Sequence, residues 1–221
     1  MSDKSHSDQV DDPRREIFKQ QTSESFAALG RYIQEFELMV DCIRTQCTSF
    51  LGGSVRSQIV FSHHAFTAQP LFDLYRALIL NELSNNPAKI LPKDQILARD
   101  LLNDLTAYIQ NSVKVRNDIV HGTWRIGWAS VDQTDFRDIA VHKLKLVKDG
   151  YKIVKPVSSA SDLDKEIEKI KHIHRLLSKL NGCIAMPLCI DINLPPASKN
   201  IFYDKTSKTW SVLLPVERYQ P

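Results

Sequence analysis

Apolar side chains recur three or four positions apart along residues 23–51, and this spacing is the strongest constraint on the fold. Residues at this spacing lie on one face of an α-helix, so the pattern predicts one long helix that packs against other helices along a seam. Gly52 and Gly53 follow it and are typical of a helix terminus. The apolar positions are Phe26, Leu29, Ile33, Phe36, Val40, Ile43, Cys47 and Phe50.

Three further segments have helical spacing. The second predicted helix spans about 67–85 and the third about 92–119. The fourth begins after Ser161, which has Asp164 three residues later, an arrangement typical of a helix N-cap. Gly182 marks its end. The sequence therefore predicts a mainly α protein built on a four-helix bundle.

After the third predicted helix, apolar and polar residues alternate, in place of the helical spacing. Residues 124–131, 138–148 and 151–157 are predicted strands, and Asp149-Gly150 is a strong hairpin signal between the last two. A sheet of this size is too small to bury its own core. We therefore predict that 124–157 is a β-meander inserted between helices 3 and 4.

The composition suits one domain with additions at both ends. The chain has 221 residues, 43% of them hydrophobic, which is enough for a core. We predict a flexible lead-in at 1–21, a helical domain at 22–184, and an extended, proline-containing tail at 185–221. The net charge of +3 permits contact with nucleic acid without requiring it.

The end of the third predicted helix, residues 116–122, carries the side chains of a reactive site. Its sequence is RNDIVHG, and Gly122 is typical of a helix stop. Arg116 offers a planar, permanently charged group that matches a phosphate. His121 can accept and return a proton near neutral pH. Cleavage of an RNA phosphodiester needs both side chains. The histidine would accept the proton of the 2′-hydroxyl, and the arginine would supply a cation for the phosphorane.

The spacing of these residues bears on how they would act. On a helix, Asn117 and His121 are four residues apart and share a face, while Arg116 lies about 100° further round. The long arginine side chain can still turn its guanidinium towards the imidazole. Acid–base cleavage uses an acid as well as a base, and a symmetric dimer that pairs two such helix ends would supply two imidazoles.

Residues that follow or precede the motif, and the acids of the first helix, have two interpretations each. Lys114 is either an ordinary surface charge or an attraction for RNA phosphate. Trp124 either stacks on a base or packs the sheet against the helices. Glu35, Glu37 and Asp41, which lie off the seam of the first helix, are either solvated acids or residues that orient the motif.

The arginine–histidine spacing occurs a second time, in Arg137 and His142. That copy lies in a predicted strand, where residues five apart face opposite sides of the sheet. We interpret the second copy as coincidence. Context favours the first copy, because an asparagine follows the arginine directly and the histidine ends a helix.

In that context, RNDIVH at 116–121 resembles the signature of the HEPN superfamily (higher-eukaryote and prokaryote nucleotide-binding domains). The signature is Arg, a polar residue that is often Asn, then His at a spacing of four to six residues. The resemblance covers roughly residues 22–184, of which only 116–121 match a motif; the rest is the order of the helices. It implies an HEPN-like four-helix bundle.

The resemblance also implies an activity. Many members of the superfamily are metal-independent ribonucleases with composite sites in dimers, and they act as toxins, CRISPR effectors or anti-phage proteins. Others are non-catalytic scaffolds. By this resemblance Arg116 and His121 are catalytic and Asn117 supports them. Toxins silenced by a partner nucleotidyltransferase carry Tyr two residues after the His, whereas this chain has Thr123, which excludes that modification.

Other classes of site lack their motifs. Cys42, Cys47, Cys183 and Cys189 include no Cys-x-x-Cys pair, which favours buried free thiols in a reducing cytoplasm over a metal site. No Gly-rich phosphate loop, His-Glu-x-x-His or serine nucleophile elbow occurs. We expect no metal and no cofactor. The lack of a signal peptide and of a membrane-length apolar run predicts a cytoplasmic protein away from the membrane.

Two functions from different classes remain. The first is a metal-independent endoribonuclease, a homodimer that acts on RNA as a toxin or anti-phage component, with an antitoxin or regulatory protein as a further partner. Lys114 and Trp124 would then contact substrate. The second is a non-catalytic HEPN-like helical dimer that binds a protein or a nucleotide, with Arg116 and His121 as buried hydrogen-bonding residues.

Overall fold

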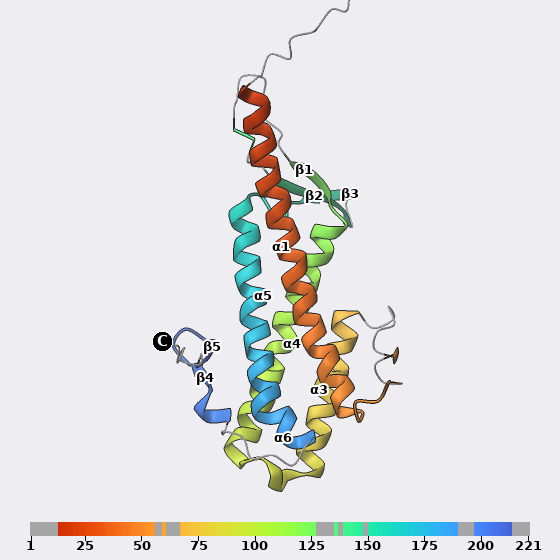
Figure 1. The fold of residues 1–221 in the computed structure, drawn as a ribbon, viewed down its shortest axis with the longest axis vertical. Helices are drawn as coiled ribbons and strands as arrows, with labels where there is room; N and C mark the ends of the chain where they lie inside the picture. The colour runs from red at the N-terminus through yellow and green to blue at the C-terminus, as the bar shows by residue number, and fades with distance from the viewer. Residues whose placement is uncertain are drawn as a thin grey trace, which may run out of the picture. The chain divides into compact units, whose positions relative to one another are not determined.

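The part of the chain that the structure describes is mainly helical, with four long helices and a small β part (Figure 1). Its described residues divide into two compact units. The first unit contains the described residues up to Tyr32 and those of Asn117–Lys165, and the second contains Ile33–Arg116 and those from Glu166 onward. The computed structural model describes residues 13–55, 59–60, 67–126, 135–136, 139–147, 150–189 and 197–213.

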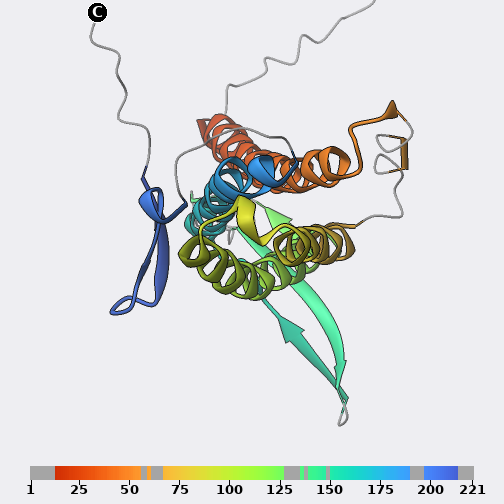
Figure 2. The same ribbon diagram turned by 90° about the horizontal axis from the view of Figure 1, so that it is seen from below.

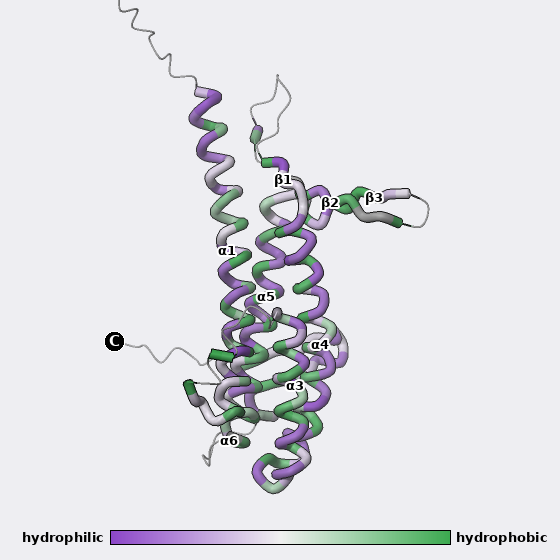
Figure 3. The backbone as a smooth tube through the Cα atoms, turned by 90° about the vertical axis from the view of Figure 1, so that its right-hand side faces the viewer, coloured by the Kyte–Doolittle hydropathy of each residue, from purple (hydrophilic) through white to green (hydrophobic). Residues whose placement is uncertain are grey.

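Segments of all four long helices lie side by side in the second unit (Figures 1 and 2). These helices are α1 (Pro13–Phe50), α3 (Ala68–Asn85), α4 (Pro92–Val120) and α5 (Ala160–Leu180). Hydrophobic and hydrophilic positions alternate along α3 and α4 (Figure 3), as expected of helices with one buried face. The predicted mainly α class is confirmed, and α3 and α4 have nearly the predicted bounds. Fully buried side chains of this core include Met39, Ile43, Leu71, Phe72, Tyr75, Ile79, Leu101, Leu105, Ile109 and Leu177.

α1 begins at Pro13, so residues 13–21 of the predicted lead-in are helical. In the first unit, the ring of Phe18 packs edge-on against that of Phe136, with 5.2 Å between the ring centroids. Gln21 Oε1 accepts a hydrogen bond of 2.6 Å from the backbone N–H of Phe136, 115 positions away. Apolar spacing within the segment could not reveal such distant contacts. The rest of the predicted lead-in lies outside the described residues.

The buried stripe of α1 in the first unit also differs from the predicted seam. Ser25, Ala28 and Tyr32 are buried there, whereas Phe26 is 60% exposed. The hydroxyl of Ser25 donates to the carbonyl of Gln21 at 3.0 Å, which allows a small polar side chain to be buried. In the second unit the predicted seam is correct, because its members there include the buried residues Phe36, Val40, Ile43 and Cys47.

A three-stranded antiparallel sheet belongs to the first unit (Figure 2). Its strands, in spatial order, are β1 (Thr123–Ile126), β2 (Ile139–Val147) and β3 (Gly150–Val154). The predicted meander is therefore confirmed. β3 ends at Val154 instead of 157, and residues 127–131, 138 and 148 of the predicted strands lie outside the described residues. The ladder between β1 and β2 pairs Thr123 with His142.

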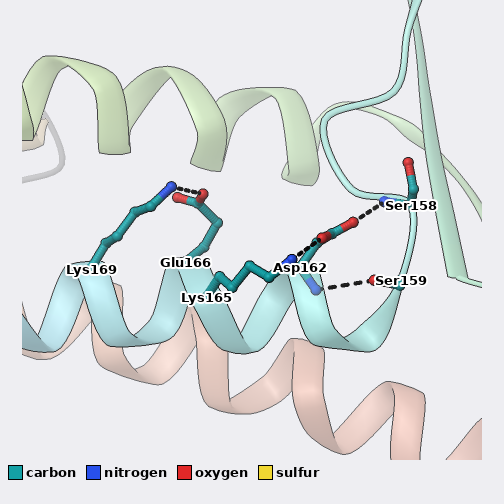
Figure 4. Close-up of polar contacts among 6 residues, drawn as sticks. All are labelled: Ser158, Ser159, Asp162, Lys165, Glu166 and Lys169. Carbon is teal, nitrogen blue, oxygen red and sulfur yellow. Dashed lines mark hydrogen bonds and ion pairs between the residues drawn. The ribbon is translucent and has the colours of Figure 1, made fainter.

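The N-terminus of α5 is capped two residues before the predicted position. The backbone N–H of Asp162 donates to Ser159 Oγ, and the backbone N–H of Ser158 donates to Asp162 Oδ2, both at 3.2 Å (Figure 4). The predicted cap, Ser161 with Asp164, is therefore wrong. Two overlapping Ser-x-x-Asp patterns occur here, and the sequence pattern alone does not distinguish them.

Helical structure also continues through Gly182, where the sequence predicts an end. A π-helical turn (Asn181–Ala185) leads into α6 (Met186–Cys189), and the backbone N–H of Met186 donates to the carbonyl of Asn181, five residues earlier. Pro187 has no N–H, and its ring would clash with the carbonyl of a regular preceding turn. The wider turn relieves that clash.

Part of the predicted extended tail is a docked hairpin of the second unit. β4 (Ile201–Asp204) pairs with β5 (Thr209–Val212) in an antiparallel ladder. Trp210 is buried, and its indole N–H donates to Asp104 Oδ2 of α4 at 2.7 Å. This contact joins residues 106 positions apart, so local composition did not predict it. The tail residues 190–196 and 214–221 lie outside the described residues.

Candidate active site

The C-terminal end of α4 carries the motif. The helix ends at Val120, and the backbone N–H of His121 donates to the carbonyl of Asn117 at 3.1 Å. Ile119 is fully buried, Asn117 is half-buried and His121 is exposed. Burial of Ile119 therefore anchors the last turn while the imidazole remains accessible to solvent.

Gly122 stops the helix through close packing rather than through a left-handed turn. Its φ lies outside the left-handed region. A Cβ atom at this position would collide with Cγ1 of Val141 in β2, and it would lie 2.7 Å from the carbonyl oxygen of Asp118. The predicted stop is correct, but the glycine is needed because β2 approaches the helix end so closely.

Asp118, inside the motif, has a structural contact that the sequence did not indicate. Its side chain is only 9% exposed, and Oδ1 lies 2.9 Å from Nζ of Lys143 in β2. A buried carboxylate needs such a partner, because removal from water is costly. The ion pair therefore connects the end of α4 with β2 within the first unit.

Trp124 makes a second connection of this kind. Its indole N–H donates to the carbonyl of Ile119 at 2.9 Å, and its side chain is half-buried. Carbonyls at the end of a helix lack partners within the helix, and this bond satisfies one of them. The geometry favours the packing interpretation of Trp124 over base stacking.

Arg116 belongs to the second unit, because the division between the units falls between Arg116 and Asn117. Its guanidinium carbon lies 5.8 Å from the centroid of the Phe36 ring, and Nη2 lies 3.8 Å from Oε1 of Glu37, both residues of α1. These contacts favour the interpretation of Glu37 as a residue that orients Arg116. The arginine side chain is 29% exposed, although its Nε atom is buried. Lys114 is exposed on α4.

His142, which belongs to the second copy of the arginine–histidine spacing, is a further histidine beside the motif. The β1–β2 ladder places it opposite Thr123, and its carbonyl oxygen lies 3.5 Å from an ideal Cβ on Gly122. Partial burial, followed by the charges of Arg125 and Lys155, lowers the pKa of His142. Strand pairing, and not its spacing from Arg137, brings His142 here; Arg137 itself lies outside the described residues.

Comparisons with known proteins assign no family and no function to this site. No family model, no curated protein and no solved structure matches the chain. Across the described ranges, no group of three His, Cys, Asp or Glu side chains is arranged to hold a metal ion. None of the helices that the structure describes has the length and apolarity to cross a membrane.

The first unit therefore offers an accessible imidazole on a well-fixed backbone. Gly122, Trp124 and Asp118 hold the end of α4 against the neighbouring strand and turn. His121 can exchange a proton there, and Arg125 is exposed on the adjacent strand. Such an arrangement suits proton transfer to or from a bound anion.

Proposed function

We propose that the protein is a metal-independent endoribonuclease of the HEPN type. The exposed imidazole of His121, held at a fixed helix end, is the observation that carries the proposal. The strands that follow it, β1, β2 and β3, contain no acidic residue. A proton-transfer group in cationic surroundings suits a substrate whose backbone is anionic.

In the proposed reaction, His121 removes the proton of an RNA 2′-hydroxyl, and the alkoxide attacks the adjacent phosphorus. The bond between phosphorus and the 5′ oxygen breaks, that oxygen takes up a proton, and a 2′,3′-cyclic phosphate remains. Arg116 binds the phosphate oxygens as negative charge develops on them, and Asn117 hydrogen-bonds the phosphate or the imidazole. Lys114 adds charge that attracts the substrate.

A homodimer would complete this chemistry. Acid–base cleavage needs one group that removes a proton and another that supplies one, and the partner subunit's His121 would be the second. We further propose a role as a toxin or anti-phage component, restrained by an antitoxin or regulatory protein. Because Thr123 replaces the modifiable tyrosine, that restraint would act through binding and not through tyrosine modification.

The proposal is tested by incubating the purified protein and His121→Ala with structured RNA in the presence of a chelator. His121→Ala should cut RNA about 10²–10⁴ times more slowly, the range expected for loss of a general acid or base. His172→Asn, which removes an imidazole from α5 in the second unit, should cut at the unchanged rate. Equal cutting by the parent chain and His121→Ala would count against the proposal.

The contacts of Arg116 favour a second candidate, a non-catalytic HEPN-like helical dimer that binds a protein or a nucleotide. Phe36 and Glu37 give the guanidinium a packing role between α1 and α4. In that case Arg116→Ala should lower the melting temperature, and no variant or parent chain should cut RNA. The exposure of His121 does not fit the buried role that this alternative assigns to it.

A further inference from the structure

One face of the β1–β3 sheet is composed of residues from all three strands. In an antiparallel ladder, directly paired residues share a face, and so do residues two apart along a strand. The pairs are Thr123 with His142 and Leu144 with Ile153. We call this the outer face, and its members are Thr123, Arg125, His142, Leu144, Tyr151 and Ile153.

The outer face is open to solvent. Leu144, Tyr151 and Ile153 are 64%, 68% and 54% exposed, and Thr123 and Arg125 are exposed as well. The opposite face carries the residues that contact the end of α4, among them Trp124 and Lys143. The contacts with α4 thus lie on the opposite face, which leaves the outer face available for a ligand.

Positive charge gathers on the outer face next to the motif. Arg125 pairs with Ala140, two residues before His142 in β2. The exposed Lys155 directly follows Val154, which pairs with Lys143. Both cations lower the pKa of His142, after the larger effect of partial burial. No aspartate or glutamate occurs in the three strands. A polyanion is therefore complementary to this face. A second copy of the same face would bring like charges together, which opposes self-association there.

We propose that the outer face binds single-stranded RNA. Arg125, His142 and Lys155 contact phosphates, and the ring of Tyr151 stacks on a base, a combination that recurs in proteins that bind single strands. The inference rests on the proposed function, because the outer face begins at Thr123, two residues after His121. A strand bound along it leads to the proposed catalytic imidazole.

Binding is measured by fluorescence anisotropy in the His121→Ala background, with a labelled 2′-O-methyl RNA of about 15 nucleotides that cannot be cleaved. The test variant adds Arg125→Gln and Lys155→Gln. The matched control adds Lys152→Gln, which lies on the opposite face of β3, and Lys169→Gln on α5, and it has the same net charge. A DNA strand of the same sequence and anionic phospholipid vesicles are further probes.

The test variant should bind RNA at least about tenfold more weakly. For two lost phosphate contacts, its slope of log affinity against log salt concentration should be shallower by about 1.4. Tyr151→Ser should weaken binding about fivefold or more through lost stacking. The control should change affinity less than about threefold. All substituted side chains are exposed, and circular dichroism checks that each variant folds.

Equal RNA affinity of the test variant and the control would overturn the inference, as would binding to vesicles or to DNA alone. Cleavage measured in parallel, with His121 intact, separates the two proposals. If the chain cuts RNA while the test variant binds it normally, the inference fails and the proposed function stands. If binding is lost in the test variant while no chain cuts RNA, the inference holds and the proposed function fails.

Discussion

His121 and Gly122 are neighbours in the sequence, but the first needs access to solvent and the second needs close packing. The imidazole has to remain accessible to act on a substrate, whereas Gly122 lies where β2 approaches the helix too closely for any side chain. Asp118 and Trp124 add an ion pair and a hydrogen bond at the same place. Several contacts around one residue thus hold the backbone of His121 without covering its ring, as a proton-transfer group requires.

Gly122→Ala should destabilise the first unit by about 1–3 kcal/mol, the usual range for overpacking. The added methyl would meet Val141 and the backbone carbonyl of Asp118, and a carbonyl in a helical turn cannot move aside as a side chain can. Denaturant titration measures the change. The double variant with Val141→Ala should recover only part of the loss. An unchanged free energy of unfolding for Gly122→Ala would contradict the packing described.

Cys47 provides a prediction about pH. Its side chain is fully buried, its thiol lies 3.7 Å from the carbonyl of Leu71, and burial raises its pKa from 9.0 to about 12. Above pH 9 the unfolded chain loses this proton while the folded chain keeps it, so stability falls as pH rises. The free energy of unfolding of the parent chain should decline more steeply between pH 9 and pH 11 than that of Cys47→Ala. Parallel curves for the two proteins would show that the thiol is not protected.

The sequence identified the linear part of the candidate site. Arg116, Asn117 and His121 are consecutive or four apart on one helix, and helical periodicity alone predicts that arrangement. The position of His142 follows from the pairing of β1 with β2, and that of Glu37 from contact between two helices. Neither kind of contact leaves a periodic signal in the sequence, so the structure was needed to place His142 and to decide between the two interpretations of Glu37.

For helices and strands, the prediction from sequence was correct where the local sequence is unambiguous. α3 follows Thr67 and α4 begins at Pro92, positions that apolar spacing and helix-start chemistry both indicate. Prediction failed where distant contacts decide the outcome. The start of α1 and the hairpin of β4 with β5 depend on such contacts.

The cap of α5 offers a paired test at this scale. Ser159→Ala should destabilise the protein by about 1 kcal/mol, since it removes the acceptor for the backbone N–H of Asp162. Ser161→Ala, two residues along, is the control; Ser161 is exposed within the helix and should change stability by less than about 0.5 kcal/mol. Thermal unfolding of both variants gives the comparison. A larger loss of stability in Ser161→Ala than in Ser159→Ala would instead support Ser161 as the N-cap, as the sequence predicted.

At the scale of the whole molecule, the proposal depends on two copies of the chain. α4 contains the boundary between the two compact units, with Arg116 on one side of it and Asn117 on the other. The proposed chemistry needs a cation and two imidazoles at one phosphate. A homodimer provides them by symmetry, and no cofactor is required for this reaction.

Mixing the parent chain with His121→Ala tests the dimer. The proposed chemistry uses two imidazoles at one phosphate, so a heterodimer with one intact His121 should cut slowly. An equal mixture that exchanges subunits contains about one-quarter parent homodimers, and its cleavage rate should therefore fall to about one-quarter of that of the same total amount of parent chain. Sedimentation velocity checks that dimers form and exchange. A rate of about one-half, the value for subunits that act independently, would contradict a composite site.

The proposed function requires His121 to perform acid–base catalysis on an RNA 2′-hydroxyl without a metal. An RNA of one sequence is incubated in chelator, with or without a single 2′-deoxy substitution at the cleaved nucleotide, and the end groups are identified by mass spectrometry. We expect 2′,3′-cyclic phosphate and 5′-hydroxyl ends, no cleavage at the 2′-deoxy nucleotide, and a rate about 10²–10⁴ times lower for His121→Ala. Cleavage that continues at the 2′-deoxy nucleotide, or at the parent rate in His121→Ala, would rule out this mechanism.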